Sequence, residues 1–284
     1  MNTEYNIPNI DIAWCPGCGN YAIHDILRKT LQELNIPPEK LVIVSGIGQA
    51  AKAPQYIKCN YFNGLHGRSL PVATAIKACN PDLIVIAESG DGCMYGEGGN
   101  HLLHTIRRNP DITVLIHNNM VYGLTKGQAS PTSPKGFTTP VQIQGTISDP
   151  INPISLAISQ RASFVARAYC ADTEQTKEII KQAITHKGLA IVDILQPCVT
   201  FNKINTYKWF KEHTYYFKNH NPSDISAAFA KAIEVDPLPL GIFYKQEKPT
   251  FEEQLPIYSK NRDAIFKRKH DLAKIKEILD IRRG

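Results

Sequence analysis

Five short apolar runs, separated by longer amphipathic stretches, constrain the fold of this chain more than any other feature. The runs cover residues 41–44, 83–87, 113–116, 164–166 and 190–194. Each suits a strand and is too short for a buried helix, and none alternates with polar residues, so both faces of each strand should be covered. The sequence therefore predicts an α/β fold, a parallel sheet with helices on both faces.

The stretches between these runs are expected to form helices. Residues 22–34 place Ile and Leu on one face and end at Pro37-Pro38. Helices are also predicted at 71–77, with Pro71 at the first position, at 100–108, and at 173–186, where Asp172 caps the start. Residues 129–154 contain five prolines and are predicted to form a long functional loop, and 241–244 resembles a last short strand.

Length and charge favour one domain followed by a basic tail. We expect one α/β unit over residues 1–250 and a helical tail over 251–284. Residues 259–284 hold nine Lys/Arg and four acids, so five of the six net positive charges lie there. The body is near neutral, which argues against nucleic-acid binding. The tail is expected to expose its basic side chains to solvent or to contact another subunit. Docking of an acidic protein is the less favoured alternative.

The lack of a recognisable targeting signal and the number of cysteines both indicate the cytoplasm. No apolar run approaches the 18 residues of a membrane span, and the first residues lack the pattern of a signal peptide. Seven cysteines with one C-x-x-C pair suit metal ligation or reduced thiols better than a disulfide framework. We therefore expect a cytoplasmic protein that contacts no membrane.

The segment Gly90-Asp91-Gly92 and Asn119, which lies 28 residues after Asp91, together suggest a site for a metal-bound diphosphate. The aspartate is expected on a turn after one strand and the asparagine just past the next, so a carboxylate and an amide oxygen could share one Mg²⁺. The glycines allow backbone N–H groups to approach phosphate, and the helix that follows offers a partly positive N-terminus.

This spacing matches the signature of thiamine diphosphate (ThDP) enzymes, and motifs elsewhere narrow the match. They are 14–20 (WCPGCGN), 45–48 (SGIG), 65–68 (LHGR), 123–132 (GLTKGQASPT) and 195–198 (LQPC). In this order they resemble the beta subunit of 2-oxoacid:ferredoxin oxidoreductases over about residues 12–250. The resemblance implies oxidative decarboxylation of a 2-oxoacid, either 2-oxoglutarate, which the 123–132 region favours, or pyruvate, with coenzyme A as acyl acceptor and ferredoxin as electron acceptor.

The resemblance also implies roles for individual residues. Mg²⁺ would be held by Asp91, Asn119 and the carbonyl of Val121. Lys52 and Lys126 would face the substrate carboxylate, His66 would contact the diphosphate or the thiazolium region, and Leu124 would shape the substrate pocket within a closing loop. The remaining contacts to the cofactor would come from Ile47, Gly48, Gly67, Arg68, Gly90, Gly92, Gly123 and Thr125.

Cys15, Cys18 and Cys198 match three of the four ligands of the family's [4Fe-4S] cluster, since thiolates are the usual ligands of such clusters. The fourth family cysteine is replaced by Gln49. Cys59, ten residues further on, is the candidate substitute; otherwise the cluster has a labile iron or is absent, with zinc as a lesser option. The other three cysteines, Cys79, Cys93 and Cys170, are expected to be buried.

One component of ThDP chemistry lies outside this chain. Enzymes of this class use a glutamate on a second domain to protonate the cofactor's pyrimidine, and one α/β unit leaves no room for that domain. We therefore expect an alpha or fused gamma-alpha partner and a heterotetramer that is inactive without it. The alternatives are a different ThDP-dependent decarboxylase and a non-catalytic subunit that binds the cofactor.

Overall fold

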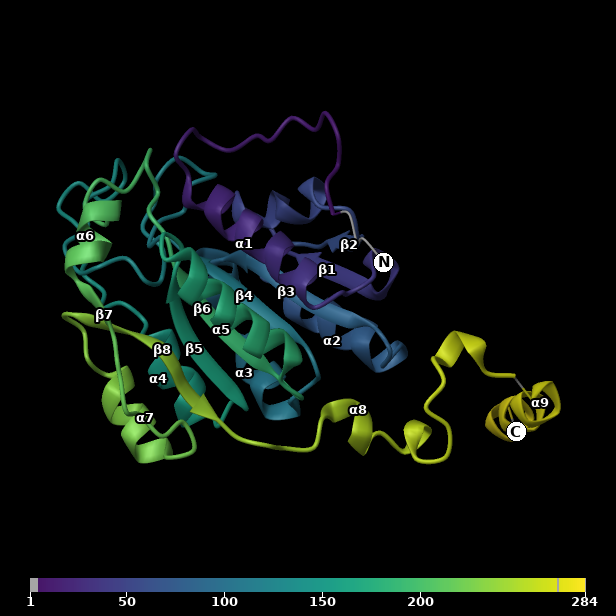
Figure 1. The fold of residues 1–284 in the computed structure, drawn as a ribbon. Coiled ribbons are helices and arrows are strands. Elements are labelled where there is room, and N and C mark those ends of the chain that lie inside the picture. Colours follow the sequence, from purple (N-terminus) through teal and green to yellow (C-terminus); the bar gives the residue numbers. More distant parts are fainter. Residues whose placement is uncertain (1–4, 270, 284) are drawn as a thin grey trace.

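Six neighbouring parallel strands make up most of one eight-stranded sheet in the computed structural model, which describes residues 5–269 and 271–283 (Figure 1). The strand order is β2-β1-β3-β4-β6-β5-β8-β7. The strands are β1 (Leu41–Ser45), β2 (Asn60–Asn63), β3 (Ile84–Gly90), β4 (Thr113–Asn118), β5 (Phe164–Tyr169), β6 (Ala190–Leu195), β7 (Thr214–Tyr216) and β8 (Leu238–Lys245). All five predicted core strands and the last short strand are therefore confirmed.

The sheet is mostly parallel, with one exception at its C-terminal edge. Strand β8 pairs with β5 in the antiparallel direction, and β7 pairs with β8 in parallel. An apolar run reports burial and carries no information about direction, so the sequence could not reveal this reversal. Strand β8 begins before the predicted run and includes Leu238 and Pro239.

Helices cover both faces of the sheet, as predicted, and each layer encloses its own core (Figure 1). On one face α1 (Gly19–Glu33) and α5 (Thr173–Thr185) bury Ile and Leu against the sheet. On the other lie α2 (Ser69–Cys79), α3 (Gly99–Arg108), α4 (Pro153–Ser159) and α7 (Ile225–Ala232). Successive β1 residues alternate between the two cores, which explains why this strand is continuously apolar.

Local sequence explains how several helices begin. The Asp172 carboxylate accepts a hydrogen bond from the Gln175 N–H, so the predicted cap of α5 is confirmed. Helix α2 begins at Ser69, which places Pro71 third rather than first. Proline is tolerated there because the N–H groups of the first turn have no partner within the helix. The long loop is also confirmed, since residues 129–152 contain no helix or strand.

The C-terminal part divides into a packed segment and a helix that stands apart. After β8 the chain forms α8 (Phe251–Gln254) and buries Glu252, Tyr258 and Ala264 against the body. Helix α9 (Leu272–Arg283) has no buried residue and lies clear of the body (Figure 1). Residues on both sides of the boundary expected at residue 250 therefore pack on the α/β unit. Among the described residues no helix has the length and apolar character needed to cross a membrane.

Two short elements carry no clear sequence signal. Strand β2 is exposed at all four positions and is paired only through β1, so it lacks the apolar pattern of the other strands. Helix α6 (Tyr207–Glu212) lies in the aromatic and polar region after β6. Together with β7 it shows that this region is more regular than its composition suggests.

Candidate functional site

The carboxyl edge of the parallel sheet gathers the residues that the sequence singled out. Asp91 directly follows β3, Asn119 directly follows β4, and the 46–49 segment follows the neighbouring β1. Because parallel strands end at a common edge, segments far apart in sequence meet there, as in other open α/β sheets. This explains how one cavity can form from distant motifs.

A cavity of about 110 Å³ lies at this edge. Its lining includes most of the predicted residues, which are Ile47, Gly48, His66, Gly90, Asp91, Gly92, Asn119, Val121, Gly123, Leu124 and Thr125. The structure does not bring Gly67, Arg68, Lys52 or Lys126 into this lining. Gln49, Ala50, Cys93 and Tyr122 complete it, and of these the sequence singled out only Gln49, for a different role.

Asp91 begins a helical segment rather than occupying the expected turn. It has α-helical backbone angles and precedes the π-helical segment η3 (Gly92–Glu97). The carboxyl is 2% exposed and accepts hydrogen bonds at Oδ2 from Ser130 Oγ (2.6 Å) and Thr132 Oγ1 (2.7 Å). Burial raises the pKa of Asp91 to about 6, against the lowering effect of the two hydroxyls.

Oxygen atoms suitable for Mg²⁺ surround the cavity. Asn119 is half-buried, and its Oδ1 accepts from the Val121 N–H at 3.1 Å across a turn made possible by the positive φ of Met120. A carboxylate, an amide and a backbone carbonyl form the hard donor set that Mg²⁺ prefers, so the residues present fit the cation. Asn118 has a different role, since its amide nitrogen donates to Asp193 and its Oδ1 lies 2.9 Å from the Thr132 hydroxyl, whose single proton is shared between this oxygen and Asp91 Oδ2.

His66 and Tyr122 are linked through Glu97 at the cavity mouth. The Glu97 Oε2 atom lies 2.9 Å from His66 Nε2 and 3.1 Å from the Tyr122 hydroxyl. The Tyr122 ring also covers Gly92, where a Cβ would lie 2.2 Å from a ring carbon. His66 Nδ1 is buried without a hydrogen-bond partner, which leaves it available to a ligand. Neither Glu97 nor Tyr122 was predicted from the sequence to belong to the site.

The lysines predicted to face substrate lie outside this lining. Lys52 is half-buried in the short helix η2 (Ala50–Tyr56), two residues after the cavity residue Ala50. Lys126 is exposed, with a φ of +81°, in the loop that Tyr122 and Gln128 close by backbone hydrogen bonds. No carboxylate within residues 5–269 and 271–283 forms an ion pair with either ammonium group. Both charges therefore remain available to an anion.

The predicted cluster ligands line a second, adjoining cavity of about 40 Å³. Cys15, Cys18 and Cys198 border it together with Gln49. Burial, with smaller contributions from the neighbouring Cys198 and Cys15 thiols, raises the pKa of Cys18 to about 11. Gln49, Asn119 and Gly123 line both cavities, so the two share a wall.

The structure places Cys59 elsewhere. It packs against the core below α1, and burial raises its pKa to about 12. Of the remaining cysteines, Cys93 and Cys170 are buried as expected, but Cys79 is exposed at the end of α2, so that expectation was wrong. No three His, Cys, Asp or Glu side chains in the described parts of the chain meet closely enough to hold a single metal ion.

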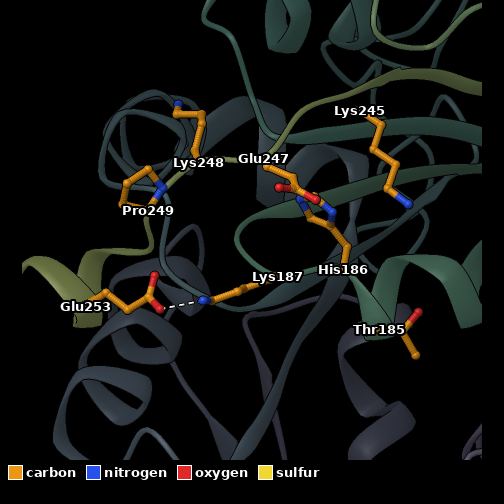
Figure 2. Close-up of a pocket in the computed structure, with 8 residues that line it drawn as sticks. All are labelled: Thr185, His186, Lys187, Lys245, Glu247, Lys248, Pro249 and Glu253. Carbon is orange, nitrogen blue, oxygen red and sulfur yellow. Dashed lines mark ion pairs between the residues drawn. The ribbon is translucent and has the colours of Figure 1, made fainter.

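A larger cavity of about 570 Å³ lies at the opposite edge of the sheet, between the end of α5 and the chain after β8. Figure 2 shows that Lys187 is turned toward Glu253, with which it forms an ion pair, whereas Lys245 and Lys248 extend away from one another. Because these cations do not converge, the cavity lacks the fixed set of donors that an anion site requires.

Comparisons with known proteins agree with this geometry. Residues 44–194 match the thiamine pyrophosphate enzyme C-terminal TPP binding domain, and residues 198–260 match the C-terminal part of the pyruvate ferredoxin oxidoreductase beta subunit. The chain is 45% identical over 258 residues to the beta subunit of 2-oxoacid:ferredoxin oxidoreductase 2 from Aeropyrum pernix, covering 86% of this chain and 84% of that protein. The chain belongs to this family of beta subunits.

Two further relatives within the family have more specific names. The 2-oxoglutarate synthase subunit KorB of Methanocaldococcus jannaschii is 34% identical, covering 85% of this chain and 90% of that protein. A solved structure of 2-oxoglutarate:ferredoxin oxidoreductase from Magnetococcus marinus, with 2-oxoglutarate, coenzyme A and succinyl-CoA bound, superposes with a TM-score of 0.90 at 33% identity. It covers 96% of this chain and 94% of that chain. The predicted family and fold are thus confirmed.

Proposed function

We propose that this beta subunit oxidatively decarboxylates a 2-oxoacid, with 2-oxoglutarate preferred, and passes the acyl group to coenzyme A and the electrons to ferredoxin. The observation that carries the proposal is the convergence of Asp91, Asn119 and Val121 on one cavity at the carboxyl edge of the sheet. Two relatives named for 2-oxoglutarate support the choice of substrate. Seven free cysteines support a cytoplasmic setting.

Thiamine diphosphate and Mg²⁺ are the cofactors that this cavity would hold. Asp91, Asn119 and the Val121 carbonyl would bind the cation, and Gly92 N–H and His66 would face the diphosphate end. When bound, ThDP supplies the nucleophilic carbon and the electron sink that decarboxylation needs. The chain's own task is to fix the anionic diphosphate through the cation and to exclude water.

A second chain completes the site in this proposal. The cavity of about 110 Å³ is well below the range of roughly 300–1,000 Å³ typical of pockets that enclose a small organic ligand. The cavity therefore suits one end of the cofactor and leaves the remainder to another surface. We assign that surface to an alpha or fused gamma-alpha chain, which would contribute the pyrimidine-binding glutamate in a heterotetramer.

Substrate recognition is assigned to Lys52, Lys126 and Leu124. If Lys52 faces the carboxylate common to all 2-oxoacids, Lys52→Ala in the assembled complex should lower kcat/KM roughly 10- to 100-fold for every substrate, since a hydrogen bond to a charged group is lost. ThDP affinity should stay unchanged. A 2-oxoacid panel with a viologen electron acceptor and titration calorimetry of ThDP measure the two effects.

Two variants provide the comparison. Lys58→Ala removes an exposed lysine outside both site cavities and should leave the panel unchanged. Leu124→Ala should instead alter the ranking of substrates, because Leu124 lines the cavity and is 37% exposed. A loss with Lys52→Ala confined to some substrates would contradict the carboxylate assignment, and no turnover of any 2-oxoacid by wild type would contradict the function.

A [4Fe-4S] cluster is the group that we assign to the cysteine cavity. Each thiolate of such a cluster binds a different iron, so its ligands lie further apart than those of a single ion. Three thiols border the cavity together with Gln49, whose Oε1 is buried without a hydrogen-bond partner. The residues present therefore fit a cluster with three thiolates and one iron that lacks a protein thiolate.

This assignment predicts that Gln49→Cys increases the iron content of the purified complex and slows the loss of iron in air. A thiolate binds iron far better than a neutral amide, so the fourth iron would be retained. Iron and sulfide assays with electron paramagnetic resonance on anaerobically prepared complex measure the effect. Cys59→Ser is the control and should change neither quantity, because Cys59 lies outside the cavity. Iron-free wild type that still reduces ferredoxin would contradict the cluster.

A further inference from the structure

Two hydroxyl groups from the long loop bind the same oxygen of Asp91. Ser130 Oγ and Thr132 Oγ1 lie 2.6 and 2.7 Å from Oδ2, and both residues are buried. The other oxygen, Oδ1, accepts neither hydroxyl. Hydrogen bonds to an ionised carboxylate are short and about twice as strong as neutral ones, so this pair fixes the rotation of the carboxylate.

Thr132 is itself held by the sheet. Its hydroxyl lies 2.9 Å from Asn118 Oδ1, and the Asn118 amide donates to Asp193 at 3.0 Å. Asp193 is fully buried on β6, where Tyr95 and Arg167 also donate to it. The Asp193 carboxylate sets the orientation of the Asn118 amide, because the reverse orientation would place the amide oxygen of Asn118 against a carboxylate oxygen of Asp193. Thr132 thus has a fixed position between the sheet and Asp91.

Ser130 belongs to a turn that contacts the second ligand segment. Its N–H donates to Ser133 Oγ at 2.8 Å, and Ser133 Oγ donates to the carbonyl of Met120 at 2.7 Å. Met120 lies between Asn119 and Val121, which provide the other proposed ligands. The 130–133 turn therefore touches both parts of the cation site, and Ser130 is also the last residue of the segment 123–130 that is expected to close over the substrate (the substrate loop).

We propose that Ser130 and Thr132 are positioning residues for the cation: by holding Asp91 through Oδ2, they leave Oδ1 directed to Mg²⁺. The proposal rests on the proposed function for the identity of the cation. It also explains why a loop rich in proline approaches the sheet here, since the hydroxyls join the substrate loop to the metal site. Ordering of that loop and loading of the cation then favour one another.

A purely structural role of these hydroxyls gives a different result from a positioning role. Thr132→Val keeps the shape and removes the hydroxyl, whereas Thr132→Ser keeps the hydroxyl and removes the methyl group. Partners that orient a metal ligand are worth roughly 10- to 100-fold in metal affinity. We expect Thr132→Val to weaken ThDP-dependent Mn²⁺ binding at least about tenfold and Thr132→Ser to restore it to within about twofold of wild type.

The experiment titrates the assembled complex with Mn²⁺ at saturating ThDP and follows free Mn²⁺ by electron paramagnetic resonance. Thr139→Val is the matched control: Thr139 is buried in the same loop, but its hydroxyl bonds Gln142. It should bind Mn²⁺ as wild type does. Ser130→Ala provides a second test of the same contact, with an expected loss of several-fold, should Thr132→Val fail to assemble.

The outcomes separate the two levels of the proposal. Wild-type affinity in both Thr132→Val and Ser130→Ala would overturn the positioning role while leaving the cofactor assignment intact. Equal losses in Thr132→Val, Thr132→Ser and Thr139→Val would also overturn it, because packing of the loop would then be responsible. Wild type without ThDP-dependent Mn²⁺ binding would overturn the cation site itself.

Discussion

Replacing Asp91 by alanine is expected to weaken Mg²⁺-dependent binding of ThDP by at least about 100-fold. This loss exceeds the roughly 10- to 100-fold loss expected when a residue that only orients a metal ligand is removed. The substitution removes a ligand oxygen and the negative charge that attracts the cation. The fold should persist, because removal of a buried carboxylate also removes its desolvation cost. Calorimetry of ThDP with Mg²⁺ on the assembled complex measures the affinity, and circular dichroism checks the fold.

Two variants make this result specific. Asp91→Asn keeps an acceptor for the Ser130 and Thr132 hydroxyls but loses the charge and replaces the oxygen directed to the cation by an NH2 group, so it should retain the fold and still bind the cation poorly. Asp149→Ala removes an exposed carboxylate of the same long loop, paired with Lys135, and should bind ThDP normally. Wild-type affinity in Asp91→Ala would show that the cation is held elsewhere.

Gly67→Ala is expected to destabilise the chain by about 3 kcal/mol, from a left-handed backbone penalty and a steric clash together. Gly67 has a φ of +72°, and a Cβ there would lie 2.5 Å from the backbone carbon of Glu97 and 2.6 Å from the Gly98 nitrogen. Backbone atoms cannot rotate away as a flexible side chain can. The midpoint and slope of urea denaturation, compared with wild type, measure the change.

The matched control for that substitution lies nearby. Gly99→Ala adds the same methyl group at the start of α3, where a Cβ would meet no atom within 4 Å. Alanine favours helix over glycine, so this variant should be neutral or slightly more stable. A Gly67→Ala midpoint equal to that of Gly99→Ala would show that the contact between residues 67 and 97–98 is not close in solution.

The contact between Gly67 and residues 97–98 also keeps His66 beside Glu97, so ThDP affinity should fall in Gly67→Ala.

The sequence predicted those parts of the fold and the site that depend on chain order alone. Asp91 and Asn119 follow strands recognisable as apolar runs, and parallel strands bring their ends together, so their meeting at one cavity follows from periodicity. The same reasoning missed β2, whose four exposed residues have no apolar pattern. It also missed the direction of β8, because burial is the same in either direction.

Contacts made by folded-back loops could not be predicted. Ser130 and Thr132 reach Asp91 from about 40 residues away through a segment without helix or strand, and no periodicity reports where such a segment lies. Glu97 lies beside His66 at the end of the π-helical segment η3, which is wound more widely than an α-helix. The glycines around this segment do not predict a π-helix. The family resemblance named Lys52 and Lys126, and both lie outside the lining of the cofactor cavity.

The wall shared by the two cavities has a consequence for protein engineering. Gln49, Asn119 and Gly123 border both the proposed cofactor cavity and the cysteine cavity. Under the proposed function, a redesign at any of the three would change the decarboxylation step and the electron transfer together, so their effects on turnover would not add in a simple way. Independent tuning should begin at residues that line one cavity alone: at Leu124 and Thr125 for the first cavity, and at Val199 and Thr200 for the second.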